Sequence, residues 1–99
     1  MAVTWDKQPA SRAGVSLIFN TTGTSQQSST FGVQTYQIRV ATAAASAFIR
    51  IGNNPTATST GNSMQLGTNT TDYFCVTPGQ QVAVVQGSAA GTVSVTEMD

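Results

Sequence analysis

The sequence is short of the residues on which most enzyme chemistry depends. It has no histidine, the side chain that most often serves as a general base near neutral pH and most often binds a metal. Its one cysteine, Cys75, has no partner within the chain for a disulfide bond. The four acidic and four basic residues cancel and make up 8% of the chain, against about 25% in an ordinary soluble domain. We therefore expect no catalytic residue, no metal site and no bound cofactor.

The same sparseness excludes several kinds of partner. A nucleic-acid-binding domain carries clustered basic side chains, whereas Lys7, Arg12, Arg39 and Arg50 are scattered along the chain. A membrane helix needs about 18 or more consecutive apolar residues, and no such run occurs. Residues 1–9 contain neither the cationic nor the apolar segment of a secretory signal. The sequence thus predicts no nucleic-acid or membrane binding, and synthesis in a cytoplasm.

What the sequence does contain is short stretches of alternating apolar and polar residues, separated by Gly, Pro or Asn. This pattern is typical of strands in a sandwich or barrel. At residues 77–80, Pro78 and Gly79 occupy the two central positions that a type II turn requires. We expect an all-β fold, a small antiparallel β-sandwich of jelly-roll type with about eight short strands. The expected strands are residues 15–20, 33–40, 43–51, 62–66, 72–76, 81–86 and 92–98, with 25–31 as an edge strand or a loop.

The domain organisation follows from the same pattern. Residues 1–13 are predicted to form an N-terminal arm, and residues 14–99 a single sandwich domain. Within the strands, alternation predicts inward-facing side chains at Tyr36 and Met64, among others. Cys75 lies between Phe74 and Val76 with no basic neighbour, so we expect a buried and inert thiol.

Two carboxylates remain as candidates for chemistry. Asp72 and Glu97 could form the acid pair of a glycosidase. No third group completes a site with them, so solvated charges that aid solubility explain these residues better.

The composition favours association with other chains. An uncharged surface rich in Ser, Thr and Gln gives little electrostatic protection against self-association, and open sheet edges are usually guarded by lysine. The chain has one lysine, Lys7. Trp5 precedes the first expected strand and is a side chain that commonly anchors interfaces. A lid folded back on its own domain explains Trp5 equally well.

Several segments together resemble one group of proteins. The sequence reads Gly-Asn-Asn-Pro-Thr-Ala-Thr at 52–58, Asp-Tyr-Phe at 72–74, Val-Thr-Pro-Gly-Gln at 76–80 and Gly-Thr-Val-Ser-Val-Thr-Glu-Met at 91–98. Over residues 33–98 the chain resembles small virion structural proteins of tailed bacteriophages. The resemblance implies a β-sandwich subunit without catalytic residues, a capsid decoration or cement protein that bridges major capsid protein subunits on the virion surface. It also implies synthesis in a bacterial host cytoplasm.

We expect such a subunit to self-associate as a homotrimer and to bind the major capsid protein. The contacts are predicted in the N-terminal arm, with Trp5 as its anchor, and in the polar segment 25–31, by strand addition. The residues expected to bind the partner are Trp5, Lys7, Arg12, Ser28, Ser29 and Phe31.

Two other functions stay open at this point. The chain could be a tail, head-fibre or adhesin-like module whose loops 52–61 and 66–71 bind host glycans. It could also be an enzyme that acts on polysaccharide through Asp72 and Glu97. Location in the virion separates the first from a decoration protein, and substitution of the two acids tests the second.

Overall fold

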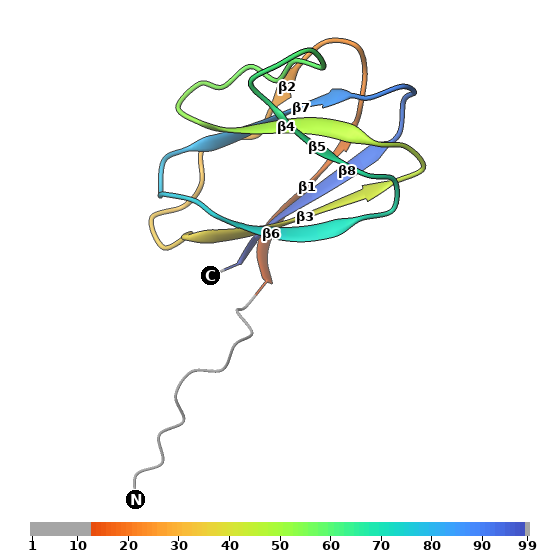
Figure 1. Ribbon diagram of the computed structural model, residues 1–99. Coiled ribbons are helices and arrows are strands. Elements are labelled where there is room, and N and C mark those ends of the chain that lie inside the picture. The colour runs from red at the N-terminus through yellow and green to blue at the C-terminus, as the bar shows by residue number, and fades with distance from the viewer. Residues whose placement is uncertain (1–12, 99) are drawn as a thin grey trace, which may run out of the picture.

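Residues 13–98 are described by a computed structural model of the chain (Figure 1). They form eight strands and no helix, as the alternating sequence predicts. Accordingly, no helix in this part of the chain is long and apolar enough to cross a membrane. The strands are β1 (Ala13–Asn20), β2 (Gln26–Gln27), β3 (Gln37–Ala43), β4 (Ala47–Gly52), β5 (Met64–Leu66), β6 (Thr71–Cys75), β7 (Gln81–Gln86) and β8 (Thr92–Met98).

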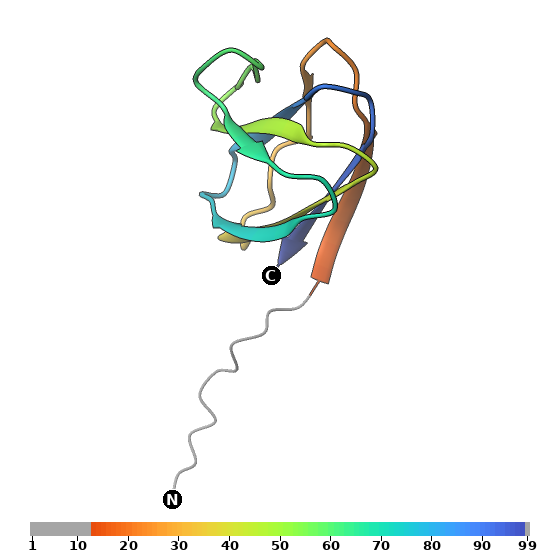
Figure 2. The same cartoon turned by 45° about the vertical axis from the view of Figure 1, so that its right-hand side comes forward.

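The strands form two antiparallel sheets that pack face to face (Figures 1 and 2). The sheet that we call sheet A has the order β1-β8-β3-β6, and sheet B has the order β2-β7-β4-β5. Every connection except the one from β4 to β5 crosses from one sheet to the other, which is the arrangement of a jelly roll. The predicted fold class is confirmed.

Alternation along the strands places one face of each sheet in a shared apolar core. Sheet A contributes Ile38 and Val40 of β3, and sheet B contributes Ile49 of β4, all of them almost completely buried. Burial of each such side chain stabilises the fold by about 1.5–3 kcal/mol. The core residues are Phe31, Ile38, Val40, Ala47, Ile49, Leu66, Val76, Val82, Val84, Val93 and Val95.

One turn at the end of the sandwich has the type that its sequence predicts. Gly79 has a φ of 87°, and the N–H of Gln80 donates to the carbonyl of Thr77 at 3.1 Å. This is the type II turn predicted at 77–80, and it leads directly into β7, whose bounds match the predicted strand.

Residues 33–36 are a correction to the prediction, because β3 begins at Gln37 and not at residue 33. The N–H of Thr35 donates to the carbonyl of Gly32 at 3.1 Å and closes a turn there. Val33 and Tyr36 are consequently 85% and 63% exposed, and the inward orientation expected for Tyr36 is wrong.

Two further strands are shorter than predicted. Residues 44–46 turn the chain from β3 to β4, with Ala44 in the left-handed region at a φ of 74°. Met64 opens β5 at the margin of sheet B and pairs with the core residue Ile49, so it lies on the predicted inner face and is 45% exposed there. Asn62, two residues earlier, also has a positive φ, and the chain joins the sheet only after this bend.

Candidate interaction surfaces

The open edges of the two sheets differ in how they are protected. Sheet B ends in β2 and β5, which have two and three residues, and short edge strands offer few free main-chain groups. Sheet A ends in β6 and in β1, with five and eight residues. Only the edges of sheet A are therefore long enough to accept a partner strand along most of their length.

The β6 edge carries a guarding acid. Asp72 pairs with Val40, whose side chain lies in the core, so strand alternation gives Asp72 an inward direction at the margin of the sandwich. Its carboxylate accepts the N–H of Tyr73 at 3.0 Å. An inward-pointing charge on an edge strand opposes pairing with another sheet.

The β1 edge has no such guard. The described residues of β1 include no charged side chain, and Ile18 is 72% exposed. The N–H of Thr21 donates to Gly91 on the β8 side, so alternation turns the main-chain groups of Ser16 and Ile18 away from β8. In Figure 2 this strand runs along the right-hand margin of the sandwich. A long, uncharged, apolar edge of this kind is suited to pairing with another chain.

The outer face of sheet B is covered by its own chain. Residues 53–63, which we call the 53–63 loop, connect β4 to β5 and lie over this sheet (Figure 1). Ala57 of the loop packs with Ala83 and Val85 in a second apolar cluster. The side chain of Gln27 donates to the carbonyl of Pro55 at 2.6 Å and fastens the loop to β2.

The outer face of sheet A carries mainly small and hydroxyl side chains, together with a few larger ones, and no described segment covers it. The strand registers line up Ile18, Ser94, Ala41 and Thr71 in one row. A neighbouring row consists of Ser16, Thr96, Arg39 and Tyr73. The hydroxyls of Ser16 and Thr96 are 2.8 Å apart and hydrogen bond with each other. The result is a nearly uncharged face with one cation.

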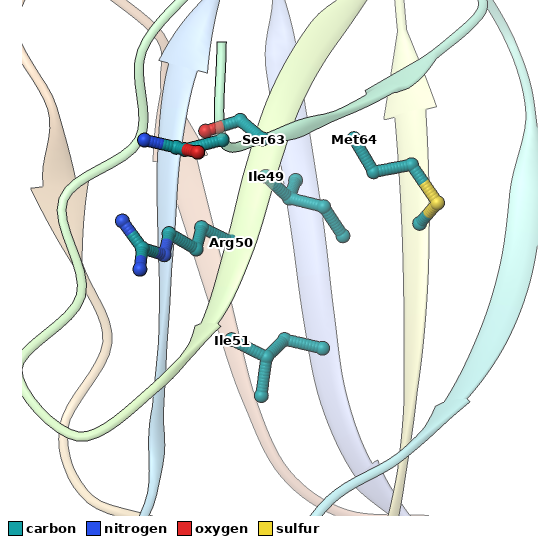
Figure 3. A pocket seen from close by; sticks show the side chains of 6 residues that line it. Ile49, Arg50, Ile51, Ser63 and Met64 are labelled. Carbon is teal, nitrogen blue, oxygen red and sulfur yellow. The ribbon is translucent and has the colours of Figure 1, made fainter.

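A hollow of about 290 Å³ lies beside β4, at the margin of sheet B. Arg50 projects to one side of the strand, and Ile49 and Ile51 project to the other (Figure 3). The lining residues are Ile49, Arg50, Ile51, Asn62, Ser63 and Met64.

The residues predicted to bind a partner differ in position and in exposure. Trp5, Lys7 and Arg12 lie outside the described residues. Ser29 is exposed, whereas Ser28 and Phe31 are 4% and 5% exposed. Segment 25–31 does contain an edge strand, but only of two residues.

The burial of Ser28 and Phe31 corrects their assignment as contact residues. Phe31 belongs to the core. The hydroxyl of Ser28 donates to the carbonyl of Ser29 and accepts the N–H of Val82 at 3.0 Å. Both side chains hold the segment onto the sandwich. A lone apolar residue that ends a polar run is a sequence signal for such a return to the core.

The candidate catalytic carboxylates serve structural hydrogen bonds. Glu97 is buried, and its Oε1 accepts the hydroxyl of Thr35 at 2.6 Å and the N–H of Gly32 at 3.0 Å. Asp72 is exposed and bonds to its own strand. They flank β3 on different sides, Asp72 opposite Val40 and Glu97 opposite Ile38. Residues 13–98 give no positive sign of catalysis.

Cys75 is exposed on β6, so its predicted burial is wrong. Its neighbours Phe74 and Val76 face inward or into the core, and alternation then turns Cys75 outward. Among the described residues, no group of three or more His, Cys, Asp or Glu side chains could hold a metal ion.

Comparisons with known proteins bear on the fold. Neither a scan against family models nor a search of curated proteins finds a match. Among solved structures, hydroxypropylphosphonic acid epoxidase from S. wedmorenis, in complex with fosfomycin, is similar over 84% of this chain. The TM-score is 0.55 at 8% identity, and the match spans only 42% of the epoxidase chain.

A second similar structure comes from Bacillus endospore appendages, described as a novel family of disulfide-linked pili. It matches over 99% of this chain and 96% of its own length, with a TM-score of 0.52 and 10% identity. Identities this low show a shared β-sandwich fold and nothing more specific.

Proposed function

We propose that this protein is a virion structural subunit, a decoration protein that binds the outside of a tailed-phage capsid and stabilises it. Its partners are the major capsid protein and further copies of itself, in a homotrimer. The observation that carries the proposal is the outer face of sheet A, which is nearly uncharged and is bordered by the unguarded β1 edge. The sequence resemblance to small phage virion proteins is the reason for choosing the major capsid protein as the partner of this surface.

The proposed mechanism is mechanical and needs no reactive group. A specific protein interface requires about 1,000 Å² or more of buried surface. Three copies linked in a trimer add their separate footprints, because binding of one raises the effective concentration of the others. A trimer that bridges neighbouring capsid subunits adds buried area that must be lost before the shell ruptures.

The direct test is binding to undecorated shells of the phage that encodes the chain. Purified protein is mixed with shells, and its occupancy is measured after sedimentation. Ala41→Asp places a charge at the centre of the sheet A face and is expected to reduce occupancy about tenfold or more, as a desolvated charge in an interface does. The matched control is Ser59→Asp on the exposed part of the 53–63 loop, which should bind as the unaltered protein does. Full binding by Ala41→Asp, or no binding by the unaltered protein, would contradict the proposal.

A second candidate function is a subunit of a tail, fibre or other filament. The observation that favours it is the match to the endospore pilus protein over nearly the full length of both chains. Cys75 is the single cysteine, and one thiol per chain can link at most two copies, so repeated disulfides could not hold such a filament together. Immunogold labelling of particles separates the candidates: label over the head supports decoration, and label confined to the tail supports the filament.

A further inference from the structure

The hollow beside β4 is a strand position that none of the described strands fills. β5 pairs with β4 only from Ala47 to Ile49, where Met64 is the last partner. The N–H of Gly87 donates to the carbonyl of Ser46, so the main-chain groups of Ser46 point toward β7. Because these groups alternate along a strand, the main-chain groups of Ile51 point to the opposite side, where β5 lies. The main-chain groups of Ile51 therefore point into the hollow, beyond the end of β5.

The two sides of this position differ in chemistry. Arg50 lies on one side, and it forms no hydrogen bond or ion pair with another described residue. Ile51 and Met64 lie on the other side (Figure 3). An added strand presents successive side chains to opposite faces. The position is thus complementary to an extended segment in which an apolar side chain is followed by an acidic one.

The N-terminal arm contains this pattern. Residues 3–6 read Val-Thr-Trp-Asp, so Trp5 would share a face with Val3 while Asp6 faces the other way. We propose that the arm of a second copy adds as a strand beside β4, with Trp5 against Ile51 and Met64 and with Asp6 against Arg50. Main-chain pairing supplies affinity, and the two side chains supply specificity.

The occupant is a second copy because of where the arm joins the sandwich. This junction is at Ala13, at the start of β1. β1 and β2 form one margin of the sandwich and β5 and β6 form the other, so the arm leaves on the margin away from the hollow. Asp6 lies seven positions before Ala13, and seven steps of roughly 3.3 Å can span about 23 Å to a neighbour.

Contacts of this type run from the arm of one copy to the hollow of the next, so they are heterologous. Such contacts close into a ring when the rotation between copies permits it, and three of them would close the homotrimer. The inference concerns how copies bind one another. It can fail or hold in solution whatever particle the protein belongs to.

Trp5 is the only tryptophan and therefore reports its own burial. We expect its fluorescence emission to shift to shorter wavelength as the protein associates over a dilution series, in step with the mass measured by sedimentation. Trp5→Ala should weaken association about 30-fold or more, the loss typical of an aromatic anchor. Association without an emission shift would overturn the proposal.

The charge pair allows a sharper test. Arg50→Asp or Asp6→Arg alone should weaken association about three- to tenfold, and the double exchange Asp6→Arg with Arg50→Asp should restore it. Mixing the two single variants should restore association only in part, because a ring of three copies drawn from two variants keeps at least one arm against a hollow of like charge. The matched control is the double variant Ser88→Asp with Ala89→Asp in the exposed turn from β7 to β8, which changes net charge equally and should alter association less than about twofold.

Two results would contradict the inference. One is a monomer at every concentration whose Trp5 emission is already shifted, since the arm would then fold back on its own chain. The other is equal weakening by Arg50→Asp and by the Ser88→Asp, Ala89→Asp control, since net charge and not the hollow would then control association.

Discussion

Sheet A and sheet B have four strands each, but among residues 13–98 only sheet B has its outer face covered by a segment of its own chain. The 53–63 loop buries Ala83 and Val85 there, and these small apolar side chains form a second, thinner core. On sheet A the equivalent central position is Ala41, which stays partly exposed between Ser94 and Thr71. The same residue type in the same kind of strand therefore belongs to the fold on one side and to a surface on the other.

The two edge strands of sheet A also differ from each other, in how well they are protected against pairing with another chain. Asp72 guards β6, whereas β1 combines length, exposed Ile18 and no charged side chain. An unguarded edge promotes uncontrolled association, so a sequence that leaves one open beside a bare face is consistent with a surface meant for a partner.

The largest expected effect comes from placing the same charge on both faces. Ala83→Asp buries a carboxylate under the 53–63 loop and should lower the free energy of unfolding by about 3 kcal/mol or more. Ala41→Asp should lower it by less than about 1 kcal/mol. Urea unfolding of the two variants measures this contrast. Equal losses would mean that the two faces do not differ as described.

A lysine on the open edge tests β1. Ile18→Lys should reduce binding to undecorated shells about tenfold, or about 1.4 kcal/mol, because a charged edge resists strand pairing. The free energy of unfolding should change by less than about 0.5 kcal/mol, because the side chain is exposed. A binding isotherm together with a melting curve separates the two quantities. Unchanged binding would remove β1 from the contact.

A smaller change in stability is expected from the hydrogen bonds that hold the 53–63 loop on sheet B. Gln27→Ala removes the hydrogen bonds to Pro55 and Asn54 and should lower the free energy of unfolding by about 1 kcal/mol. Gln65→Ala on exposed β5 is the control and should change it by less than about 0.5 kcal/mol. If thermal unfolding shows no difference between these variants, the loop is held by its apolar contacts alone.

The smallest expected change in stability comes from the turn that connects β3 of sheet A to β4 of sheet B. Ala44 has a φ of 74°, a conformation that favours glycine. Ala44→Gly should therefore raise the free energy of unfolding by about 0.5 kcal/mol, since relief of strain slightly exceeds the added flexibility of the unfolded chain. Denaturant midpoints measured with unchanged slope check this, and a clear loss of stability would show that the turn is not strained.

The sequence predicts strands best where alternation and turn chemistry agree. β7 and β8 have the predicted bounds, because the Pro78-Gly79 turn and the inward valines allow one register. β3 begins later than predicted, because exposed Val33 and Tyr36 mimic the alternation of a strand. An apolar pattern does not tell whether the main chain is paired.

The interaction surfaces are less visible in the sequence, for physical reasons. Alternation between Phe74 and Val76 places Cys75 outside, whereas the lack of a basic neighbour and the usual burial of free cysteine predict a buried thiol. The hollow beside β4 depends on the bend at Asn62, which ends the pairing of β5 early. The bare face of sheet A depends on which loop covers which sheet, and loop length alone does not decide this.

The most direct measurement is an electron cryo-microscopy map of the decorated particle. The account predicts density for the sandwich on the outer surface of the head, with the outer face of sheet A and β1 against the shell and the 53–63 loop toward solvent. A map in which the 53–63 loop contacts the shell and sheet A faces solvent would contradict it, as would particles whose heads carry no such density.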